Sequence, residues 1–283
     1  MLITNQTLKQ HLNDPQWVIF DCRHDLTNPA KGEAQYREGH IPGAHFANTD
    51  VDLSGEKTGL NGRHPLPPSA SFIAFLARHG VTNQSTIVAY DDVGGQFAAR
   101  LWWMCRWVGL TQVALLDGGI SKWVADGLAL SSTVPVVVRT AEAALNATAN
   151  PLMLISAVEL LAQLADDDLA LIDARPPERY RGDIEPMDPV AGHIPGALNH
   201  FYKNNLAADL TFKSADILRK QFAELIGNRR LIVNQCGSGV TACANIFALE
   251  LAGVTNTQLY AGSWSEWVSD PARPVVTLPI KET

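Results

Sequence analysis

The sequence predicts an α/β protein with two tandem domains, each a small parallel sheet flanked by helices. Its 283 residues exceed what one hydrophobic core usually supports, which indicates two domains. The pentapeptide His-Ile-Pro-Gly-Ala occurs at residues 40–44 and again at residues 193–197, which indicates a duplication. In each half, short apolar runs alternate with longer segments of helical spacing, the pattern of parallel strands joined by crossover helices.

The expected elements follow the same order in the two halves. In the first half, β-branched and aliphatic runs predict strands at residues 17–20, 86–90 and 113–116, and helical spacing predicts a helix at residues 69–79. In the second half, strands are expected at residues 169–172, 231–234 and 257–260, and a helix at residues 214–226. The repeated order supports the duplication.

The duplication extends beyond the pentapeptide. An apolar run that ends in Asp-x-Arg precedes each copy, at residues 21–23 and 173–175, and a glycine-containing segment that ends in tryptophan follows later in each half. We therefore predict a first domain over residues 1–140 and a second over residues 151–283, joined near residues 136–151.

The composition excludes several classes of protein. The chain has 22 Lys and Arg residues against 29 Asp and Glu residues, a formal net charge of −7, so no basic surface for a nucleic-acid backbone is expected. The N-terminus lacks a basic start followed by an apolar block, and no apolar stretch reaches the ~18 residues of a membrane span. Four cysteines are too few for a disulfide scaffold. We expect a cytoplasmic protein with no membrane and no nucleic-acid partner.

Three of the four cysteines are interpreted as structural. Cys22 and His24 form one ligand-like pair, but a structural zinc site usually takes four protein ligands and no second pair accompanies them. No metal site is therefore expected. Cys105 lies in the aromatic-rich segment 101–107 and Cys243 on an apolar helix face, and both settings are typical of buried cysteines.

Cys236 is different, because it lies in a glycine-rich loop between a strand and a helix. The run Cys-Gly-Ser-Gly-Val-Thr occupies residues 236–241. Parallel α/β folds place ligand sites at the carboxyl ends of strands, and Gly237 and Gly239 permit the tight turns of an anion-binding loop. Thr241 is expected to cap the following helix, whose N-terminus stabilises a thiolate. We predict that Cys236 is the reactive nucleophile.

Together these motifs resemble the tandem-domain rhodanese-like sulfurtransferases, and the cysteine loop resembles that of the 3-mercaptopyruvate sulfurtransferase branch. The resemblance covers nearly the whole chain and rests on the paired Gly-His-Ile-Pro-Gly-Ala turns together with the loop. In that family only the C-terminal domain carries the reactive cysteine. This agrees with Asp91, which stands in the first half where Cys236 stands in the second. The first domain is therefore expected to be noncatalytic.

The resemblance implies sulfur transfer in two half-reactions. The Cys236 thiolate attacks the sulfur of a small anionic donor and becomes a persulfide, and an acceptor then removes that sulfur. The loop amides stabilise negative charge on sulfur in both states. The implied acceptors are cyanide or a thiol, with a thioredoxin-like protein as one protein partner, and no metal or organic cofactor is required. The residues expected to contact the donor are Arg179, Gly237, Gly239, Val240 and Thr241.

The expected donor is 3-mercaptopyruvate, with thiosulfate as the alternative. Thiosulfate-preferring members typically carry cationic side chains at the two positions where this chain has Gly237 and Ser238. The resemblance points to Arg179 as the cationic anchor of the donor, whereas Arg181 is more typical of a surface arginine. The mercaptopyruvate branch tends to have a second arginine after Glu-Pro, where this chain has Met187. With Met187 in place of that arginine, three alternatives remain. The donor binds more weakly than in the branch, another residue of this chain takes the role of the missing arginine, or the donor is a different molecule.

Ser238 and His40 are the candidates for proton transfer. The Ser238 hydroxyl can relay a proton from the donor or to the leaving enolate, and the resemblance assigns a histidine matching His40 to such a relay with an acid partner. Glu33 is the nearest candidate for that acid. The alternative for His40, and for His193 in the second copy, is a packed histidine that hydrogen-bonds the backbone of its turn.

Two other functions are weighed against sulfur transfer. Cysteine phosphatases use the same strand, loop and helix but need an arginine six positions after the cysteine, where this chain has Ala242. A noncatalytic rhodanese-like binding module is the remote alternative. The intact glycine-rich loop around Cys236 argues against it for the second half.

Overall fold

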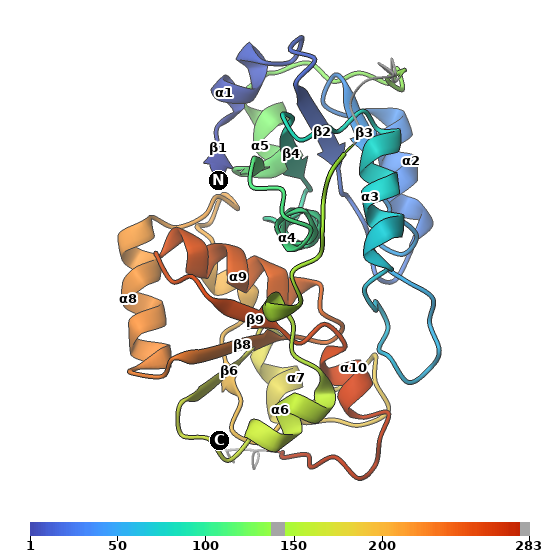
Figure 1. Cartoon of the computed structure of the whole chain (residues 1–283). Helices are drawn as coiled ribbons and strands as arrows, with labels where there is room; N and C mark the ends of the chain where they lie inside the picture. Colours follow the sequence, from blue (N-terminus) through green and yellow to red (C-terminus); the bar gives the residue numbers. More distant parts are fainter. Residues whose placement is uncertain (137–144, 278–283) are drawn as a thin grey trace. The chain divides into compact units, whose positions relative to one another are not determined.

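The computed structural model describes residues 1–136 and 145–277, and it contains two parallel β-sheets flanked by helices (Figure 1). The first sheet has the strand order β1-β5-β4-β2-β3, and the second has the order β7-β6-β8-β9. All strand pairs of these two sheets are parallel. The α/β class with two small parallel sheets, predicted from the sequence, is confirmed.

The elements follow the alternation expected from the apolar runs. Those of the first half are β1 (Leu2–Ile3), α1 (Asn5–Gln10), β2 (Trp17–Asp21), α2 (Ala30–Glu38), β3 (Ala44–Phe46), α3 (Ser69–Arg78), β4 (Thr86–Tyr90), α4 (Ala98–Trp107), β5 (Val113–Leu116) and α5 (Gly119–Ala125). Those of the second half are η1 (Pro151–Met153), α6 (Ala157–Gln163), β6 (Leu169–Asp173), α7 (Pro177–Arg181), β7 (Leu198–Asn199), η2 (Tyr202–Asn205), α8 (Ala215–Ile226), β8 (Leu231–Gln235), α9 (Thr241–Leu251), β9 (Thr257–Leu259) and α10 (Ser263–Trp267).

The chain divides into two compact units, and each unit includes a short piece from the other half of the sequence. The first unit comprises Met1–Gly55, Leu66–Asn150 and Leu206–Phe212, and the second comprises Glu56–Pro65, Pro151–Asn205 and Lys213–Thr283. The sequence prediction of continuous domains at 1–140 and 151–283 did not include this exchange. Its residues 137–140 and 278–283 lie outside the described part of the chain.

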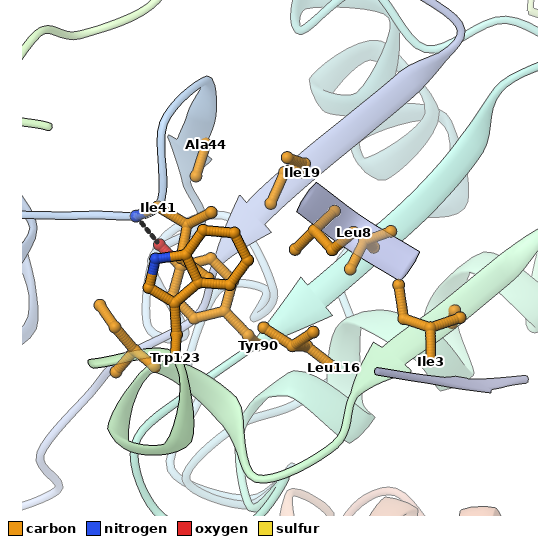
Figure 2. Packing of buried hydrophobic residues seen from close by; sticks show 11 residues of the cluster. Ile3, Leu8, Ile19, Ile41, Ala44, Tyr90, Leu116 and Trp123 are labelled. Carbon is orange, nitrogen blue, oxygen red and sulfur yellow. Dashed lines mark hydrogen bonds between the residues drawn. The ribbon is translucent and has the colours of Figure 1, made fainter. Parts of the chain in front are cut away.

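One cluster of buried side chains in the first unit lies between its sheet and two short helices. Ile19 of β2 packs with Leu8 of α1 and Trp123 of α5 in a cluster of buried side chains (Figure 2). Within the same cluster, the Ile41 N–H donates to the Tyr90 hydroxyl at 3.1 Å. This bond connects the His-Ile-Pro-Gly-Ala turn to the end of the central strand β4.

The second sheet is covered in the same way. Leu171 of β6 and Val233 of β8 pack against Leu160 of α6 and against Trp264 and Trp267 of α10. The helices α8 and α9 lie on the other side of this sheet (Figure 1). Since α9 is buried along almost its whole length, the loop that precedes it is held against a rigid element.

The Asp-x-Arg motif has one structural role in both units. The Nε of Arg23 donates to both carboxylate oxygens of Asp21, at 3.1 and 3.0 Å, and its Nη2 donates to the Gly39 carbonyl at 2.7 Å. In the second unit, Arg175 makes the same contacts with Asp173, and its Nη2 donates to a glycine carbonyl at 2.7 Å. The motif therefore ties the end of a strand to the residue before each repeated turn.

The histidines of the two repeated turns are packing residues. His40 stacks on Tyr36 with 4.1 Å between ring centroids, and His193 stacks on Tyr180 at 3.9 Å. The Nδ1 of His40 contacts the Tyr36 carbonyl at 2.8 Å, and its Nε2 contacts the Thr133 carbonyl at 3.1 Å. Because both ring nitrogens of His40 face backbone carbonyls, neither remains for a substrate. The structure therefore does not support the predicted proton-transfer role of His40.

Acidification is expected to destabilise the first unit through His45. Burial, followed by repulsion from His79 and His40, lowers the pKa of His45 from 6.5 to about 4. The unfolded chain therefore binds more protons between these two values, so the free energy of unfolding falls as the pH is lowered through this range. Denaturant unfolding at a series of pH values measures this loss. The His45→Gln variant should lose less stability than the wild type, and an equal loss would contradict the assignment.

Candidate active site

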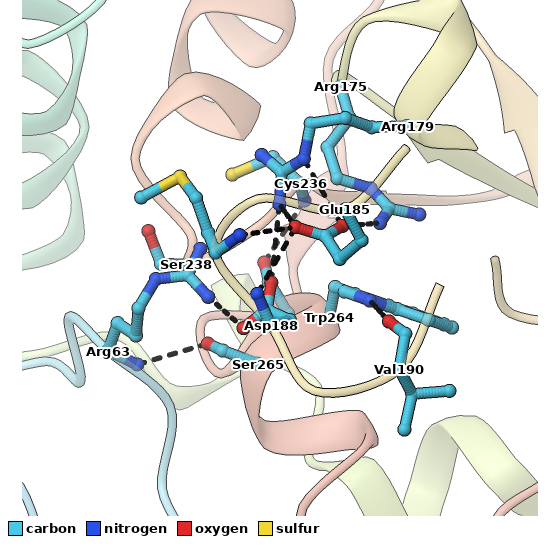
Figure 3. Close-up of polar contacts among 12 residues, drawn as sticks. Arg63, Arg175, Arg179, Glu185, Asp188, Val190, Cys236, Ser238, Trp264 and Ser265 are labelled. Carbon is cyan, nitrogen blue, oxygen red and sulfur yellow. Dashed lines mark hydrogen bonds and ion pairs between the residues drawn. The ribbon is translucent and has the colours of Figure 1, made fainter. Parts of the chain in front are cut away.

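Cys236 lies at the carboxyl end of β8, in the loop that leads into α9 (Figure 3). The strand β8 pairs with β6 on one side and β9 on the other, and Gln235 is its last paired residue. Cys236 is only 2% exposed. Its Sγ accepts a hydrogen bond from the Gly239 N–H at 3.1 Å. A main-chain amide therefore faces the sulfur, as the stabilisation of a thiolate requires.

The N-terminal turn of α10 fixes the cysteine loop from the other side. The Cys236 N–H donates to Ser263 Oγ at 3.1 Å, and the Cys236 carbonyl accepts from the Trp264 N–H at 3.0 Å. The next carbonyl, that of Gly237, accepts from the Ser265 N–H at 3.0 Å. Ser263 adopts a φ of +53°, which is strained for a residue with a side chain. Its hydroxyl offsets the strain by accepting from the Cys236 amide.

Gly239 is the position where the loop requires glycine. Its φ of +77° lies in the left-handed region, and a Cβ there would lie 2.2 Å from the Ala261 carbonyl oxygen. Any side chain would therefore push the loop away from the turn between β9 and α10. Since the Gly239 N–H is the donor to Cys236 Sγ, such a shift would move that amide off the sulfur.

Ser238 contacts a histidine that comes from a distant part of the sequence. The Nδ1 of His64 lies 2.7 Å from Ser238 Oγ, and both residues are 5% exposed. His64 belongs to the segment Glu56–Pro65, which is part of the second compact unit. A hydroxyl two residues after the sulfur is thus coupled to an imidazole, which is a suitable arrangement for moving a proton.

Arg179 lies beside the loop and is already paired with two carboxylates. Its Nε donates to Glu185 Oε2 at 3.2 Å, and its Nη2 donates to Glu185 Oε1 at 2.6 Å and to Asp188 Oδ2 at 3.2 Å (Figure 3). The side chains of Glu185 and Asp188 are each 3% exposed. The predicted anchor is therefore held in a fixed orientation by buried acids.

Asp188 also binds a second arginine, Arg63. Its Oδ1 accepts a hydrogen bond from Nη1 of Arg63, and the main-chain N–H of Arg63 donates to Ser265 Oγ at 3.0 Å. Burial raises the pKa of Asp188, while the guanidinium of Arg63 acts in the opposite direction. One buried carboxylate thus connects arginines from two separate segments of the chain.

Arg175 contacts both Glu185 and the ring of Trp264. The Nη1 of Arg175 lies 3.5 Å from Glu185 Oε2, and its guanidinium carbon lies 4.6 Å from the centroid of the Trp264 ring. The indole N–H of Trp264 donates to the Val190 carbonyl at 2.9 Å. The Asp-x-Arg motif of the second unit therefore supports the acid that orients Arg179.

The loop residues predicted to contact the donor lie around Cys236. A Cβ on Gly237 would lie 2.9 Å from Nη2 of Arg63 and 3.4 Å from Nη1 of Arg179, so both guanidinium groups meet at this residue. Val240 is 2% exposed and occupies the N-cap position of α9, and Thr241 is the first helical residue. The expectation that Thr241 caps α9 is wrong, because the cap falls on Val240, whose side chain has no acceptor.

The remaining polar candidates lie elsewhere. Arg181 is 43% exposed and pairs with Asp183, which fits the interpretation of a surface arginine. Glu33 forms an exposed ion pair within α2. Met187 contributes only its main-chain N–H, which donates to Glu185 Oε1 at 3.0 Å. The position where the family resemblance expected a second arginine therefore supplies no charge.

The other three cysteines are buried, which agrees with a structural role. Burial raises the pKa of the Cys22 and Cys105 thiols, and Cys243 Sγ donates to the Gly239 carbonyl at 3.4 Å. In residues 1–136 and 145–277, no group of three or more His, Cys, Asp and Glu side chains is arranged to hold a metal ion. No helix in this part of the chain is long and apolar enough to cross a membrane.

The corresponding loop of the first unit contains a carboxylate in place of a thiol. Asp91 follows β4 as Cys236 follows β8, and its carbonyl accepts from the Ile120 N–H at 3.0 Å. Its carboxylate accepts four main-chain hydrogen bonds of 2.8–3.0 Å, from Val93, Gly95, Phe97 and Ala98. The amides that would otherwise face a bound anion are therefore satisfied by the chain itself.

Three polar residues of this site, Arg63, His64 and Asp188, were not predicted from the sequence. The first two lie in a Gly-Arg-His-Pro run of the first half, and no repeat or spacing links that run to the cysteine loop. Their place in the second unit follows from the exchanged segment Glu56–Pro65. The sequence offered one signal for this site. In the run, a cationic residue and a histidine stand side by side between a glycine and a proline.

Residues 4–126 and 156–270 each match the protein family described as "Rhodanese-like domain". The chain belongs to this family. The resemblance predicted from the repeated turns and the cysteine loop is therefore confirmed, and it occurs in two copies as expected.

The relatives are named as sulfurtransferases, the enzyme class predicted from the sequence. A probable 3-mercaptopyruvate sulfurtransferase of Pseudomonas aeruginosa is 46% identical over 280 residues, covering 98% of each chain. A putative thiosulfate sulfurtransferase, SseB, of Mycobacterium tuberculosis is 39% identical, over 91% of this chain and 89% of that protein. The rhodanese-fold structure of SseA from Escherichia coli, described among 3-mercaptopyruvate sulfotransferases, is 32% identical with a TM-score of 0.80, covering 93% of this chain and 98% of SseA.

Gly239→Ala is expected to damage the loop more than Gly196→Ala. Both glycines have a φ of +77°, so both substitutions carry the same backbone strain. A methyl group at residue 239 would also lie 2.2 Å from the Ala261 carbonyl oxygen, whereas one at residue 196 meets nothing within 4 Å. We expect Gly196→Ala to lower the free energy of unfolding by about 1 kcal/mol and to leave Cys236 alkylation by iodoacetamide unchanged.

For Gly239→Ala, the loss of stability should be larger and Cys236 should react more slowly, because the amide that faces its sulfur is displaced. Chemical denaturation and the rate of iodoacetamide alkylation measure the two effects. Equal losses in the two variants would show that the close approach to Ala261 does not constrain the loop.

Proposed function

We propose that this protein is a sulfurtransferase that takes sulfur from 3-mercaptopyruvate onto Cys236 and passes it to cyanide or a thiol. The observation that carries the proposal is the hydrogen bond from the Gly239 N–H to Cys236 Sγ, at the carboxyl end of a central parallel strand. This geometry favours a nucleophilic thiolate and the negative charge of a persulfide in the same position. The named relatives, which cover nearly the whole chain, support the reaction class.

In the first half-reaction, the Cys236 thiolate attacks the sulfur of 3-mercaptopyruvate. An S–S bond forms, the carbon–sulfur bond of the donor breaks, and its electron pair goes to the enolate of pyruvate. The enolate takes up a proton and leaves as pyruvate, while Cys236 remains as a persulfide. In the second half-reaction, cyanide or a thiolate attacks the outer sulfur, and the S–S bond returns its electron pair to Cys236. This is covalent catalysis of the two-step kind.

Ser238 and His64 would move the proton of the first half-reaction. The donor thiol loses a proton as its sulfur bonds to Cys236, and the enolate gains one as it leaves. The Ser238 hydroxyl, with His64 Nδ1 at 2.7 Å, can accept the first proton and deliver the second without a change of position. This pair replaces the role that the sequence analysis gave to His40.

Thiosulfate is the second candidate donor. The observation in its favour is the 39% identical relative from Mycobacterium tuberculosis, which is named a putative thiosulfate sulfurtransferase. Gly237 and Ser238 in the two positions after the cysteine favour 3-mercaptopyruvate, as does the Ser238–His64 contact, because a leaving enolate needs a proton. We therefore propose 3-mercaptopyruvate as the preferred donor.

The first unit would contribute no sulfur chemistry. Its loop has Asp91 at the position of Cys236, and four main-chain N–H groups already donate to that carboxylate. All four cysteines of the chain are free thiols, which suits a reducing compartment. We therefore propose a cytoplasmic enzyme whose acceptors are cyanide, small thiols or a thioredoxin-like protein.

Replacing Cys236 with serine is expected to abolish sulfur loading, because a hydroxyl cannot form a persulfide. Wild-type protein incubated with 3-mercaptopyruvate should gain one sulfur atom in intact-mass measurements and lose it when cyanide is added. The Cys105→Ala variant is the control and should load normally, since burial raises the pKa of that thiol. Turnover of either donor by Cys236→Ser at the wild-type rate would refute the proposal. Sulfur found on Cys105 or Cys243 instead would show that Cys236 is not the cysteine that carries sulfur.

His64→Gln is expected to slow the reaction with 3-mercaptopyruvate more than the reaction with thiosulfate. Glutamine can still hydrogen-bond Ser238 but cannot accept a proton, and a proton relay of this kind contributes on the order of a hundredfold to the rate. Sulfite leaves thiosulfate as a stable anion, so the second donor serves as an internal control. Steady-state thiocyanate formation with each donor measures the effect, and an equal reduction for both donors would assign His64 a purely structural role.

A further inference from the structure

We propose that Arg63 is the second cationic anchor for the donor carboxylate, in the role left open by Met187. The proposal rests on the proposed sulfur transfer at Cys236 and identifies the part of the donor that is recognised. The guanidinium groups of Arg63 and Arg179 lie together beside Gly237, and we call this pair the clamp. Asp188 accepts a hydrogen bond from each of them and so fixes their orientation. The ligand class is a small molecule with a planar carboxylate a few bonds from the atom that Cys236 attacks.

The two guanidinium groups converge on the residue after the nucleophile. A Cβ on Gly237 would lie 2.9 Å from Nη2 of Arg63 and 3.4 and 3.6 Å from Nη1 and Nη2 of Arg179. Nη2 of Arg63 and Nη1 of Arg179 donate to no acceptor within the described residues. Nη2 of Arg63 and Nη1 of Arg179 therefore both lie near the same position beside Gly237. A carboxylate bound there could accept a hydrogen bond from each arginine, one through each of its two oxygens.

The acids hold the arginines without covering these edges. Asp188 accepts from Nη1 of Arg63 through Oδ1 and from Nη2 of Arg179 through Oδ2, so one carboxylate sets the orientation of both groups. The side chains of Asp188 and Glu185 are 3% exposed, whereas those of Arg179 and Arg63 are 13% and 25% exposed. The carboxylates are therefore less exposed than the guanidinium groups, so a donor approaching from solvent meets the guanidinium groups first.

Arg63 belongs to the segment Glu56–Pro65, which is held against the start of α10. The Arg63 N–H donates to Ser265 Oγ at 3.0 Å, and a Cβ on Gly62 would lie 2.7 Å from the Gly262 carbonyl oxygen. Gly62 has a φ of +84°, so the segment makes a tight turn against the start of α10. The next residue, His64, contacts Ser238. A single short segment thus supplies both an anion anchor and the proton relay.

The test compares two alkylating reagents that differ in one carboxylate. Iodoacetate and iodoacetamide both convert the Cys236 thiolate to a thioether and release iodide, but only iodoacetate carries the group that the clamp binds. In Arg63→Leu, the alkylation rate with iodoacetate should fall roughly tenfold or more, the loss expected for a charged hydrogen bond, while the rate with iodoacetamide stays near the wild-type value. Arg63→Lys should recover part of the difference, since it keeps the charge but not the planar geometry.

Arg181→Leu is the matched control, because Arg181 lies in the same region of the sequence as Arg179 but on the surface. It should change neither rate. The specificity constant kcat/KM for 3-mercaptopyruvate should fall in Arg63→Leu by about the same factor as the iodoacetate rate.

Two results would overturn the proposal. If Arg63→Leu slows both reagents equally, Arg63 supports the fold of the loop and does not bind carboxylate. If only Arg179→Leu lowers the ratio of the iodoacetate rate to the iodoacetamide rate, Arg179 is the sole anchor. Failure of the proposed function looks different: the wild-type protein would gain no sulfur from 3-mercaptopyruvate, whereas the ratio of the two alkylation rates would still depend on Arg63.

Discussion

The hydrogen bond from the Gly239 amide to the Cys236 sulfur sets the geometry on which the rest of the site depends. It requires the left-handed backbone of Gly239, the close approach of that glycine to Ala261, and the support of α10 beneath the loop. Each requirement concerns the main chain, so the electrostatic environment of the sulfur is built before any substrate binds. In our proposal, the side chains around the loop would select the donor and move the proton.

The two compact units show how one scaffold supports different chemistry. Both tie the end of a strand to the repeated turn through Asp-x-Arg, and both stack the turn histidine on a tyrosine. They differ at the end of the central strand, where the Asp91 carboxylate accepts from its own loop amides and the Cys236 sulfur accepts from the Gly239 amide. Repeated motifs thus mark shared architecture, whereas function follows from the residue that the architecture presents.

The two arginines beside the cysteine loop are paired with buried carboxylates. Isolated guanidinium groups near a buried sulfur would be costly to desolvate, and the carboxylates of Glu185 and Asp188 compensate their charge. These acids are less exposed than the arginines and accept hydrogen bonds from them, so they fix the orientation of the guanidinium groups. The same arrangement makes Asp188 the link between a segment of the first half of the sequence and the loop that contains Arg179.

Sequence patterns were sufficient for the α/β class, for the alternation of strands and helices and for the duplication, because these depend on local periodicity and on repeated motifs. They also led to the proposal of Cys236, through the glycines next to it. They were not sufficient for His40, whose ring nitrogens both bond backbone carbonyls, or for Thr241, which begins α9 without capping it. Arg63 and His64 reach the cysteine loop only because the segment Glu56–Pro65 folds with the second unit. Periodicity and motif spacing report neighbours along the chain and on one element. Contacts between segments more than a hundred residues apart are decided by packing, and only the tertiary structure contains that information.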